Sequence, residues 1–581
     1  MKPQDDGLPV LAGALANWRW ALAAIGLMSG MSNVLMLTGS MFMLEVYDRV
    51  LPSRSVPTLL GLAALAIMMF VFQGTLDVLR GRVLTRIGER IGEHFGRRVY
   101  DATIRLPLKV QSDGDGLQPL RDLDKVRGFM GAGGPAALFD LPWMPLYLAV
   151  CFIFHVWIGM TASIGALMLV TVTVLTEVMI RRPTRMLAGL DVKRNSLAQA
   201  GQRNAEVLQA MGMGPRLALQ WEAVNQQYLA AQERVSDVAG GFGSVSRVLR
   251  IVLQSCVLGV GAYLVIQQEA TAGVIIAGSI LSARALAPVE LAIANWKGFV
   301  EARNAWARLE SLIELFPVEA PPMNLPAPRE SLSAEAVMVI PPGGQKPVVK
   351  EASFCLSAGQ AVGIIGPSGS GKSSLVRALV GVWPTFRGKI RLDGAAIDQW
   401  STEALGGHIG YLPQNVELFD ATVAKNIARL AAEPDGAAVV AAARAAAVHE
   451  MILGLPEGYE TRIGEGGKAL SAGQRQRVAL ACALYGNPFL VVLDEPNSNL
   501  DNEGEAALTQ AILGVRARGG IVVVVAHRPS ALAGVDQILV MDAGSVQAFG
   551  AKDEVMKRVL RPASIPPLAL KVVPEGPGAK Q

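Results

Sequence analysis

Charge and cysteine are both scarce in this chain. Charged residues make up 18% of its 581 residues, against about a quarter in an average soluble domain. The formal net charge of +4 is too small to indicate a nucleic-acid partner. Four cysteines are scattered without any C-x-x-C spacing, at Cys151, Cys256, Cys355 and Cys482. The sequence therefore argues against a disulfide scaffold, a zinc site and nucleic-acid binding.

The N-terminal segment also lacks the features expected of a cleavable signal peptide. Asp5 and Asp6 disrupt the basic region that such a signal needs, and no clear A-x-A site follows the first apolar stretch. That stretch, after Trp20, is as long as a membrane span and longer than the core of a typical signal. We expect it to remain in the protein as the first span.

Long apolar runs are abundant, and they are concentrated in the first half of the chain. A membrane-spanning helix needs roughly 20 apolar residues. Six runs are candidates, at 20–44, 56–79, 138–155, 157–180, 248–266 and 272–296. They pair into three hairpins with short turns, separated by two long polar connections at 80–137 and 181–247. The pattern predicts a polytopic helical membrane domain.

Basic residues gather in the two long connections rather than in the short turns, for example Arg86 in the first and Arg185 in the second. The positive-inside rule therefore places both connections, and with them both termini, in the cytoplasm. In the first connection an apolar residue recurs at every fourth position, at Val83, Ile87, Ile91, Phe95 and Val99. This spacing predicts an amphipathic helix that packs on its neighbours and extends a span into the cytoplasm.

Ionisable residues inside the apolar runs are candidates for a translocation path, because a charge is costly in a membrane unless it faces a cavity or a partner. Arg284 and Glu290 lie in the sixth run beside Pro288, and Glu177 lies near the end of the fourth. The alternative is that Glu290 and Glu177 lie near the membrane surface and extend their carboxylates to water. For Arg284, near mid-span, a path or inter-helix role and a merely structural position are equally open.

A Pro-rich stretch separates this apolar half from a second half of ordinary composition. We place a membrane domain at 1–316, a linker at 317–330 and a second domain at 331–560. In the second domain, short Val- and Ile-rich runs alternate with helical patterns, which is typical of an α/β sheet domain. Residues 561–581 are again Pro-rich and are expected to form a disordered tail.

The second domain contains the phosphate-loop pattern G-x-x-x-x-G-K-S at 366–373. An apolar run predicts a strand before it and a helical pattern follows, which is the context that this pattern requires. Lys372 would reach the β- and γ-phosphates of a nucleotide, and Ser373 would ligate Mg²⁺. Backbone N–H groups of the loop and the helix N-terminus would hold the phosphates. The predicted phosphate-binding residues are Gly366, Pro367, Ser368, Gly369, Ser370, Gly371, Lys372, Ser373 and Ser374.

Four further polar residues follow the loop, each at the end of a strand-like run. In FLVVLDEP, Asp494 would reach the magnesium and Glu495 would activate the water that attacks the γ-phosphate. Gln414, in IGYLPQ, can hold that water and the magnesium, and His527, in VVVVAHRP, can contact the γ-phosphate. Taken singly, Gln414 and His527 would be interpreted as structural caps. Their order along the chain instead favours catalytic roles.

Together these motifs resemble the complete set of the ATP-binding cassette family. The set includes the signature LSAGQ, with Ser471, Ala472, Gly473 and Gln474, and the segment SNLD that ends at Asp501. The resemblance implies that the signature contacts ATP bound by a partner cassette in a head-to-tail dimer, with Asp501 in an interface loop. One cassette with six spans is half an exporter, so a homodimer that hydrolyses ATP with Mg²⁺ is implied.

The expected fold class is thus a polytopic α-helical membrane domain of six transmembrane helices, of the ABC exporter type, fused to an α/β P-loop ATP-binding cassette. The membrane half is similar to the permease/ATPases of type I secretion, in the group that exports proteases, lipases and surface-layer proteins from Gram-negative bacteria. The similarity is carried by MFMLEVYDRVLPSRS, LFDLPWMPLYLAV and SARALAPVELAIANWKGFVEARNAWARL.

This resemblance implies ATP-driven export of unfolded proteins with uncleaved C-terminal signals across the bacterial inner membrane. The implied partners are a periplasmic adaptor, an outer-membrane channel, the secreted protein and the lipid bilayer. The segment before the first run is too short for the peptidase-like domain of some relatives, so leader cleavage is not expected.

Two positions depart from the family pattern. Cassettes usually place an aromatic residue on the strand before the phosphate loop, where it stacks on adenine, but AEAVMVIPPGGQKPVV has none. Adenine would then rest on Val339, Ile340 or Pro341. Ala472 stands where glycine is commonest in the signature, a change that the retained Ser471 and Gly473 are expected to tolerate.

Other functions share parts of this pattern. A lipid or drug exporter would use the same cassette, and only the membrane motifs favour protein export over it. A membrane-anchored ATPase without transport would need neither paired spans nor long basic connections. A nucleotide-gated channel would need sustained ion conductance.

Overall fold

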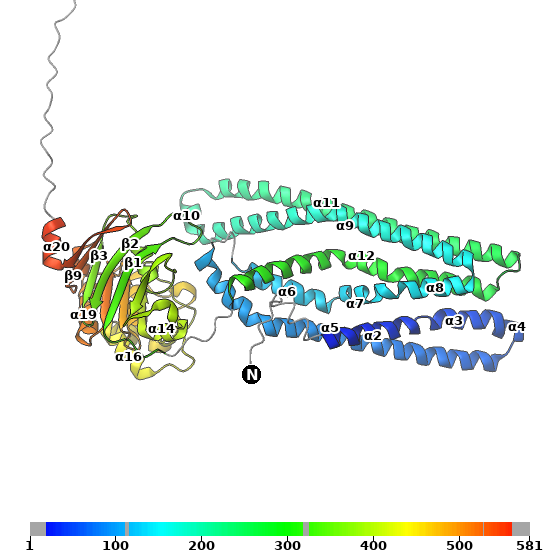
Figure 1. Ribbon diagram of the computed structural model, residues 1–581, viewed down its shortest axis with the longest axis horizontal. Helices are drawn as coiled ribbons and strands as arrows, with labels where there is room; N and C mark the ends of the chain where they lie inside the picture. Colours follow the sequence, from blue (N-terminus) through cyan, green and yellow to red (C-terminus); the bar gives the residue numbers. More distant parts are fainter. Residues whose placement is uncertain (1–18, 111–115, 318–324, 527, 560–581) are drawn as a thin grey trace, which may run out of the picture. The chain divides into compact units, whose positions relative to one another are not determined.

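The computed structural model describes residues 19–110, 116–317, 325–526 and 528–559. The chain forms two compact units: the first, up to Pro317, holds the long helices, and the second holds both β-sheets (Figure 1). The expected linker at 317–330 is described in part. The expected tail at 561–581 lies outside the described residues.

Six segments of the first unit are long and apolar enough to cross a membrane. The first begins with α2 (Arg19–Leu35) and continues, after a turn at Met36 and Leu37, with α3 (Thr38–Glu45), η1 (Val46–Val50) and α4 (Leu51–Ser53). The third combines α7 (Gly133–Asp140), η2 (Leu141–Trp143) and α8 (Met144–Phe154). The other four are α5 (Val56–Lys109), α9 (Val156–Arg203), α11 (Gly214–Ile266) and α12 (Ala272–Leu315). The six predicted spans are confirmed, although two of them are not single helices.

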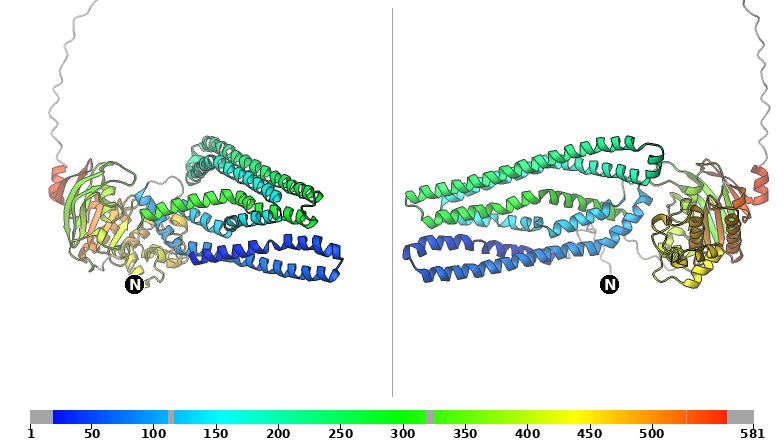
Figure 2. Two further views of the ribbon diagram at one scale, coloured as in Figure 1. Left: turned by 45° about the vertical axis from the view of Figure 1, so that its right-hand side comes forward. Right: turned by 180° about the vertical axis from the view of Figure 1, so that it is seen from behind.

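The long polar connections are helical, as predicted. The 54 residues of α5 extend over about 80 Å at 1.5 Å per residue, well beyond the ~30 Å of a bilayer core. Helices α9 and α11 lie side by side along their length in every view (Figures 1 and 2), and the first joins the second through the short α10 (Ala205–Ala210). The predicted apolar stripe of α5 is buried with residues of α6 (Gln118–Gly131) and α12, from Ile87 through Phe95 to Val99.

Asp48 of η1, at the turn of the first hairpin, binds the turn between α11 and α12 of the third hairpin. Its carboxylate accepts hydrogen bonds from Thr271 Oγ1 (2.5 Å) and from the backbone N–H of Gly273 (2.9 Å). A Cβ at Gly273 would lie 2.6 Å from Asp48 Oδ1, so the close approach requires glycine there. The first and third hairpins are therefore held together at this end.

The second unit contains two sheets. A four-stranded sheet has the order β2-β1-β4-β5, and a six-stranded sheet has the order β10-β9-β3-β8-β7-β6, in which only β10 is antiparallel to its neighbour. The strands are β1 (Ser331–Val339), β2 (Val349–Ser357), β3 (Ala361–Ile365), β4 (Arg387–Leu392), β5 (Ala395–Ala396), β6 (Ile409–Leu412), β7 (Leu490–Asp494), β8 (Ile521–Val525), β9 (Gln537–Asp542) and β10 (Ser545–Ala551).

The six-stranded sheet is buried on both faces, which explains why its central strands are continuous apolar runs. Along β7, Leu490 and Val492 pack in the cluster that contains the four-stranded sheet and α13, whereas Val491 and Leu493 pack in the cluster that contains α18 and α19. The helices are α13 (Lys372–Leu379), α14 (Thr402–His408), α15 (Val423–Ile427), α16 (Gly436–Ala445), α17 (His449–Leu453), α18 (Ala472–Leu484), α19 (Asn502–Ala517) and α20 (Lys552–Val559).

The parallel strands place the predicted nucleotide residues at one edge. β3 ends at Ile365 directly before the phosphate loop, β6 ends two residues before Gln414, and β7 ends at Asp494. Because β6 pairs with β7, β7 with β8 and β8 with β3, these carboxyl ends are adjacent. This edge is where ligands bind in open α/β sheets.

Candidate functional site

The phosphate loop has a backbone that only glycine suits at its two ends. Gly366 has φ 154° and Gly371 has φ 94°. A Cβ at Gly366 would lie 2.1 Å from the carbonyl oxygen of Met541, and one at Gly371 would lie 2.5 Å from that of Val348. The loop is therefore pressed against neighbouring backbone on both sides, and α13 begins directly after it at Lys372.

Lys372 is folded back over the loop. Its Nζ donates hydrogen bonds to the carbonyl oxygens of Gly366 and Pro367, both at 2.9 Å, and the residue is only 5% exposed. Burial lowers the pKa of the Lys372 ammonium, and the nearby carboxylates of Glu495 and Asp494 oppose that shift. A cation is thus held at the centre of the loop.

Ser373 and Asp494, the two residues predicted to reach Mg²⁺, lie together. Ser373 Oγ donates to Asp494 Oδ1 at 3.3 Å. Asp494 is 1% exposed, and burial raises the pKa of its carboxyl, while Ser373, Arg377 and Lys372 lower it. A carboxylate and a hydroxyl at the end of a strand form a donor set suited to Mg²⁺.

Ser370 supplies an independent sign of a ligand in the loop. Its hydroxyl is buried, the residue being 2% exposed, yet Oγ has no hydrogen-bond partner within the described residues. A buried hydroxyl without a partner is costly. A phosphate oxygen bound in the loop would supply the missing acceptor, so the loop fits ATP.

Glu495 occupies a left-handed backbone conformation, with φ 52°, and its N–H donates to the carbonyl oxygen of Val525 at 3.1 Å. Such a conformation is uncommon for a residue other than glycine and is frequent at functional sites. Gln414 is exposed beyond the end of β6, next to β7. His527 lies outside the described residues, although β8, which precedes it, reaches the same edge of the sheet.

The signature residues form the N-terminus of α18. Ser471 Oγ accepts a hydrogen bond from the N–H of Gln474 (3.3 Å), and Gln474 Oε1 accepts one from the N–H of Ser471 (2.9 Å). This reciprocal pair is a capping box. Ser471 and Ala472 are exposed, whereas a Cβ at Gly473 would lie 2.9 Å from the carbonyl oxygen of Asn499. Asp501 caps α19 by accepting from the N–H of Gly504 at 2.8 Å.

Gln476 of α18 was not predicted as a site residue. It is 1% exposed, and its Nε2 donates to the carbonyl oxygen of Pro496 at 3.0 Å, one residue after Glu495. Its Oε1 accepts from Asn499 Nδ2 at 3.4 Å. Gln476 therefore ties the signature helix to the loop that carries Glu495. A glutamine amid the apolar positions of a helix was the signal that could have revealed it.

The three residues proposed to support adenine differ in exposure. Val339 is fully buried at the end of β1, because alternate side chains of that strand point into the core, so the prediction that it could contact the base is wrong. Ile340 and Pro341 are partly exposed in the turn between β1 and β2. The turn adjoins the phosphate loop, since Val348 is the residue that Gly371 contacts.

The ionisable residues predicted in the spans have different surroundings. Glu290 Oε2 lies 3.0 Å from Arg250 Nη1, which links α12 to α11. Glu177 accepts a hydrogen bond from Trp296 Nε1 and lies 3.8 Å from Arg303 Nη2, which links α9 to α12. Both glutamates therefore pair between helices. Arg284 is exposed and has no hydrogen bond or ion pair in the part of the chain that the structure describes.

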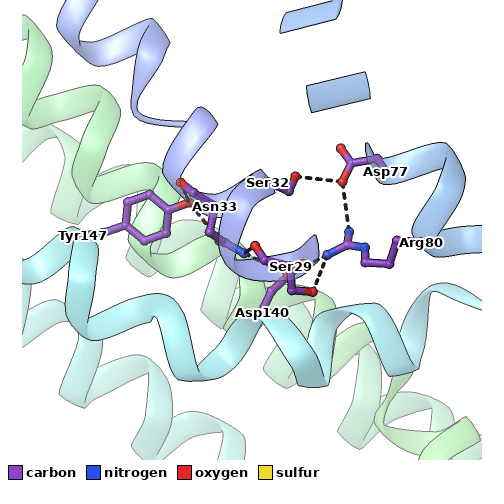
Figure 3. A network of polar contacts seen from close by, with 7 residues as sticks. All are labelled: Ser29, Ser32, Asn33, Asp77, Arg80, Asp140 and Tyr147. Carbon is purple, nitrogen blue, oxygen red and sulfur yellow. Dashed lines mark hydrogen bonds and ion pairs between the residues drawn. The ribbon is translucent and has the colours of Figure 1, made fainter. Parts of the chain in front are cut away.

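A buried polar network joins the first three spans and was not predicted (Figure 3). Arg80 Nη1 donates to Asp140 Oδ1 (2.7 Å) and to Ser29 Oγ (2.9 Å), and Asn33 Nδ2 donates to the same Asp140 oxygen (2.9 Å). Tyr147 OH donates to Asn33 Oδ1 at 2.8 Å. Ser32 and Asp77 complete the network, through a 2.8 Å hydrogen bond and a 3.3 Å contact of Asp77 with Arg80.

Two family models match the chain. The model described as "ABC transporter" matches residues 349–498, and the model described as "ABC transporter transmembrane region" matches residues 22–289. The first covers the phosphate loop, Gln414, the signature and the Asp494–Glu495 pair. The second covers the helices from α2 into α12.

Curated relatives resemble the chain over most of its length. It is 56% identical to the type I secretion system ATP-binding protein PrsD of Rhizobium meliloti, over 98% of each chain. It is 30% identical to the cyclolysin secretion/processing ATP-binding protein CyaB of Bordetella pertussis, over 94% of this chain and 77% of that one.

Among solved structures, a bacterial Atm1-family ABC exporter with ATP bound has the same fold. It superimposes with a TM-score of 0.80 and 24% identity, over 94% of this chain and 97% of the other. The predicted fold class, six spans fused to an ATP-binding cassette, is confirmed.

Proposed function

The chain belongs to the ABC transporter family, in the group of type I secretion ATP-binding proteins, and we propose that it exports unfolded proteins that carry an uncleaved C-terminal signal. It is a multi-pass membrane protein, a protein exporter and an ATP hydrolase coupled to transport. The observation that carries the finer proposal is the 56% identity with PrsD over nearly the whole of both chains.

In the proposed reaction the phosphate loop holds ATP. Lys372 exchanges its two carbonyl acceptors for the β- and γ-phosphates, and Ser370 Oγ gains a phosphate acceptor. Ser373, Asp494 and Gln414 are the oxygen ligands available to Mg²⁺, which would neutralise phosphate charge when bound.

In this proposal the attacking water is placed by Glu495 and Gln414, which follow the adjacent strands β7 and β6. Glu495 accepts the proton of the water as it attacks the γ-phosphate, and Gln414 orients that water. His527 contacts the γ-phosphate. The left-handed backbone of Glu495 supports this assignment, because such uncommon conformations in residues other than glycine cluster at functional sites.

The active form is proposed to be a homodimer. Ser471, Ala472, Gly473 and Gln474 lie at the exposed N-terminal end of the 13-residue α18, where backbone N–H groups and the helix dipole favour an anion. That anion is the γ-phosphate of ATP held by the second copy. Asp501, at the N-terminus of α19, lies in the loop at the same interface.

The proposed location is the bacterial inner membrane, with the N-terminus and the cassette in the cytoplasm. The Arg-rich connections support this orientation. A periplasmic adaptor and an outer-membrane channel would continue the export route, as the resemblance to type I secretion proteins implies.

Arg284 and Glu290 of α12 are the proposed residues of the translocation path. The charge of Glu290 is paired with Arg250. Arg284 is exposed, and its charge acts on the nearby Tyr147 hydroxyl without a hydrogen bond or ion pair in the described ranges. We propose that its guanidinium contacts the passing polypeptide. We assign contact with the cargo to Arg284 and a helix-positioning role in the path to Glu290.

Comparison of culture media tests the function. A strain carrying Glu495→Gln should lose one or a few proteins from its medium and retain them, full length, in the cells. The matched control is Glu403→Gln, which changes an exposed glutamate in the first turn of α14, away from the site. An unchanged medium with altered envelope lipids or drug tolerance would support the lipid or drug exporter instead.

The same two strains test whether the exported proteins carry an uncleaved C-terminal signal. The missing proteins should be secreted by the control strain with their C-termini intact, as mass spectrometry can establish. Removal of the C-terminal segment from one of them should block its export. Secretion of the truncated protein at the normal level would contradict the proposed signal.

A further inference from the structure

The short helix α15 lies between Gln414 and Ser471 along the chain and packs against α18. Asn426 of α15 is 5% exposed, accepts a hydrogen bond from the N–H of Phe419 (2.9 Å) and donates to the carbonyl oxygens of Phe419 and Thr422 (3.0 Å each). These bonds hold α15 to the end of the segment that follows Gln414. None of these contacts was anticipated from the motifs.

Arg429, two residues after α15, joins this helix to two further elements. Its guanidinium donates to the carbonyl oxygens of Cys482 (2.9 Å) and Ala483 (3.1 Å) in the last turn of α18. It also donates to those of Gly406 (2.6 Å) and Ile409 (3.1 Å), at the end of α14 and the start of β6. One side chain thus satisfies four carbonyls, two of which belong to a helix end that has no intrahelical donors and favours a cation.

The backbone at Arg429 and at Gly410 of β6 has unusual features that accompany these contacts. Arg429 and Leu430 have φ 54° and 62°, a left-handed conformation that residues other than glycine keep only where the surroundings hold it. A Cβ at Gly410 of β6 would lie 2.0 Å from the carbonyl oxygen of Ala483. The last turn of α18 therefore rests directly on the backbone of β6, and Arg429 fastens the two at that point.

We infer that Arg429 is a positioning residue that holds β6 and α18 as one body and so couples the two nucleotide sites of the dimer. Gln414 follows β6 and contacts the ATP of its own subunit, whereas Ser471 begins α18 and contacts the ATP of the second copy. A movement of Gln414 toward its own ATP is passed through Arg429 to Ser471. This inference rests on the roles proposed above for Gln414 and Ser471.

The test uses the full-length protein in lipid nanodiscs with ATP and Mg²⁺. Arg429→Ala should lower kcat by about tenfold or more and bring the Hill coefficient for ATP toward unity. In the Glu495→Gln background, the Kd for ATP should change by no more than about twofold, because Arg429 contacts no nucleotide-binding residue. Arg429→Lys keeps the charge and some donors, so it should recover part of the cooperativity.

Arg516→Ala is the matched control. Arg516 of α19 also donates to two carbonyl oxygens, those of Gly359 (3.1 Å) and Gly534 (2.8 Å), but it reaches neither β6 nor α18. Its loss should lower the melting temperature while wild-type cooperativity is kept. If Arg429→Ala does not fold, Arg429→Lys carries the test: a folded protein with reduced cooperativity supports the coupling.

Four results would overturn the coupling. They are a non-cooperative wild type, unchanged cooperativity in the folded Arg429 variant, an equal loss in Arg516→Ala, and a loss of ATP affinity as large as the loss of kcat. Failure of the proposed function is recognised separately. In that case Ser471→Ala would keep normal turnover, or wild-type protein would hydrolyse no ATP, whatever Arg429 does.

Discussion

At the scale of single residues, burial and charge oppose each other around the phosphate loop. Burial lowers the pKa of Lys372 and raises that of Asp494, while each residue shifts the pKa of the other toward the charged form. Burial therefore makes the ionised form of Asp494 costly in free energy in the nucleotide-free site. Bound Mg²⁺ would remove that cost.

Asp494→Asn is expected to stabilise the nucleotide-free protein while abolishing Mg²⁺-dependent hydrolysis. Because the folded-state pKa of Asp494 is raised, its contribution to stability is fully present below the ordinary aspartate pKa and is lost as pH rises through the raised value. The melting temperature of the variant should lack this part of the pH dependence, and its advantage should grow with pH. A variant that melts below wild type at pH 8 would contradict the prediction.

Glu495→Gln and Lys372→Ala should separate binding from hydrolysis. The first removes the proton acceptor and should reduce kcat by about a hundredfold or more while ATP still binds. The second removes the loop cation and should weaken ATP binding by about tenfold or more, since a charge-assisted hydrogen bond contributes up to ~3 kcal/mol. Equilibrium titration and steady-state turnover measure the two effects. Wild-type turnover in Glu495→Gln would exclude Glu495 as the base.

At the scale of elements, the N-terminus of the signature helix α18 combines a structural role with a proposed contact to ATP. Its capping box stabilises α18 as any N-cap does, and the same serine is proposed to contact ATP in the second subunit. Gln476, which is buried further along α18, donates a hydrogen bond to the loop that carries Glu495. Substitution of Ser471 is therefore expected to change both the stability of the protein and its turnover of ATP, and the two effects can be measured separately.

Ser471→Ala should cost about 1 kcal/mol of stability, as the loss of an N-cap does, and should lower turnover by about tenfold or more through the lost phosphate contact. Ser401→Ala is the matched control, because Ser401 caps α14 in the same way, accepting from the N–H of Ala404 at 3.0 Å. The control should lose similar stability and keep its turnover. Equal turnover in the two variants would argue against contact between Ser471 and ATP.

The Arg80–Asp140 network also acts at this scale, because its hydrogen bonds connect α2, α5, α7 and α8 (Figure 3). Removing one partner of a buried ion pair typically costs about 3–5 kcal/mol. We expect Arg80→Gln and Asp140→Asn each to lower the unfolding temperature strongly, and the double variant to lose less than the sum of the two. A double-mutant cycle in detergent measures the coupling.

The pair Arg49–Glu45 provides the control for that cycle, because its side chains are 76% and 44% exposed, far more than those of Arg80 and Asp140. Its removal should cost less than about 1 kcal/mol. Additive effects of Arg80→Gln and Asp140→Asn would show that the network does not act as a unit.

At the scale of the whole molecule, the proposed function assigns ATP hydrolysis to the second unit and passage of the polypeptide to the first. Their buried clusters are separate: the apolar stripe of α5 packs with α6 and α12, and the six-stranded sheet packs within the cassette. A change in the membrane unit that does not disturb its helices should therefore affect export before it affects basal hydrolysis.

Arg284→Ala should reduce export in cells while basal ATP hydrolysis in nanodiscs is largely kept. The reason is that its side chain is exposed on α12 and makes no ion pair within the described residues, so little packing is lost. Arg284→Lys keeps the charge and should export more than the alanine variant. Normal export by Arg284→Ala would remove this residue from the path.

The sequence by itself determined the periodic and linear features. Six apolar runs of about membrane-spanning length predicted six spans, and the stripe from Val83 to Val99 predicted the buried face of α5. The phosphate loop with its flanking strand and helix was equally local, because its glycines and Lys372 lie within one short stretch, 366–373.

Tertiary structure alone decided what depends on residues far apart in the chain. Asp140 meets Arg80 across 60 positions, Gln476 meets Pro496 through a buried bond, and Arg429 reaches α18 across more than 50 positions. The exclusion of Val339 from the base site and the pairing of Glu290 with Arg250 were decided in the same way. A hydrogen bond or a buried face depends on how the elements pack, and no spacing within one element specifies that packing.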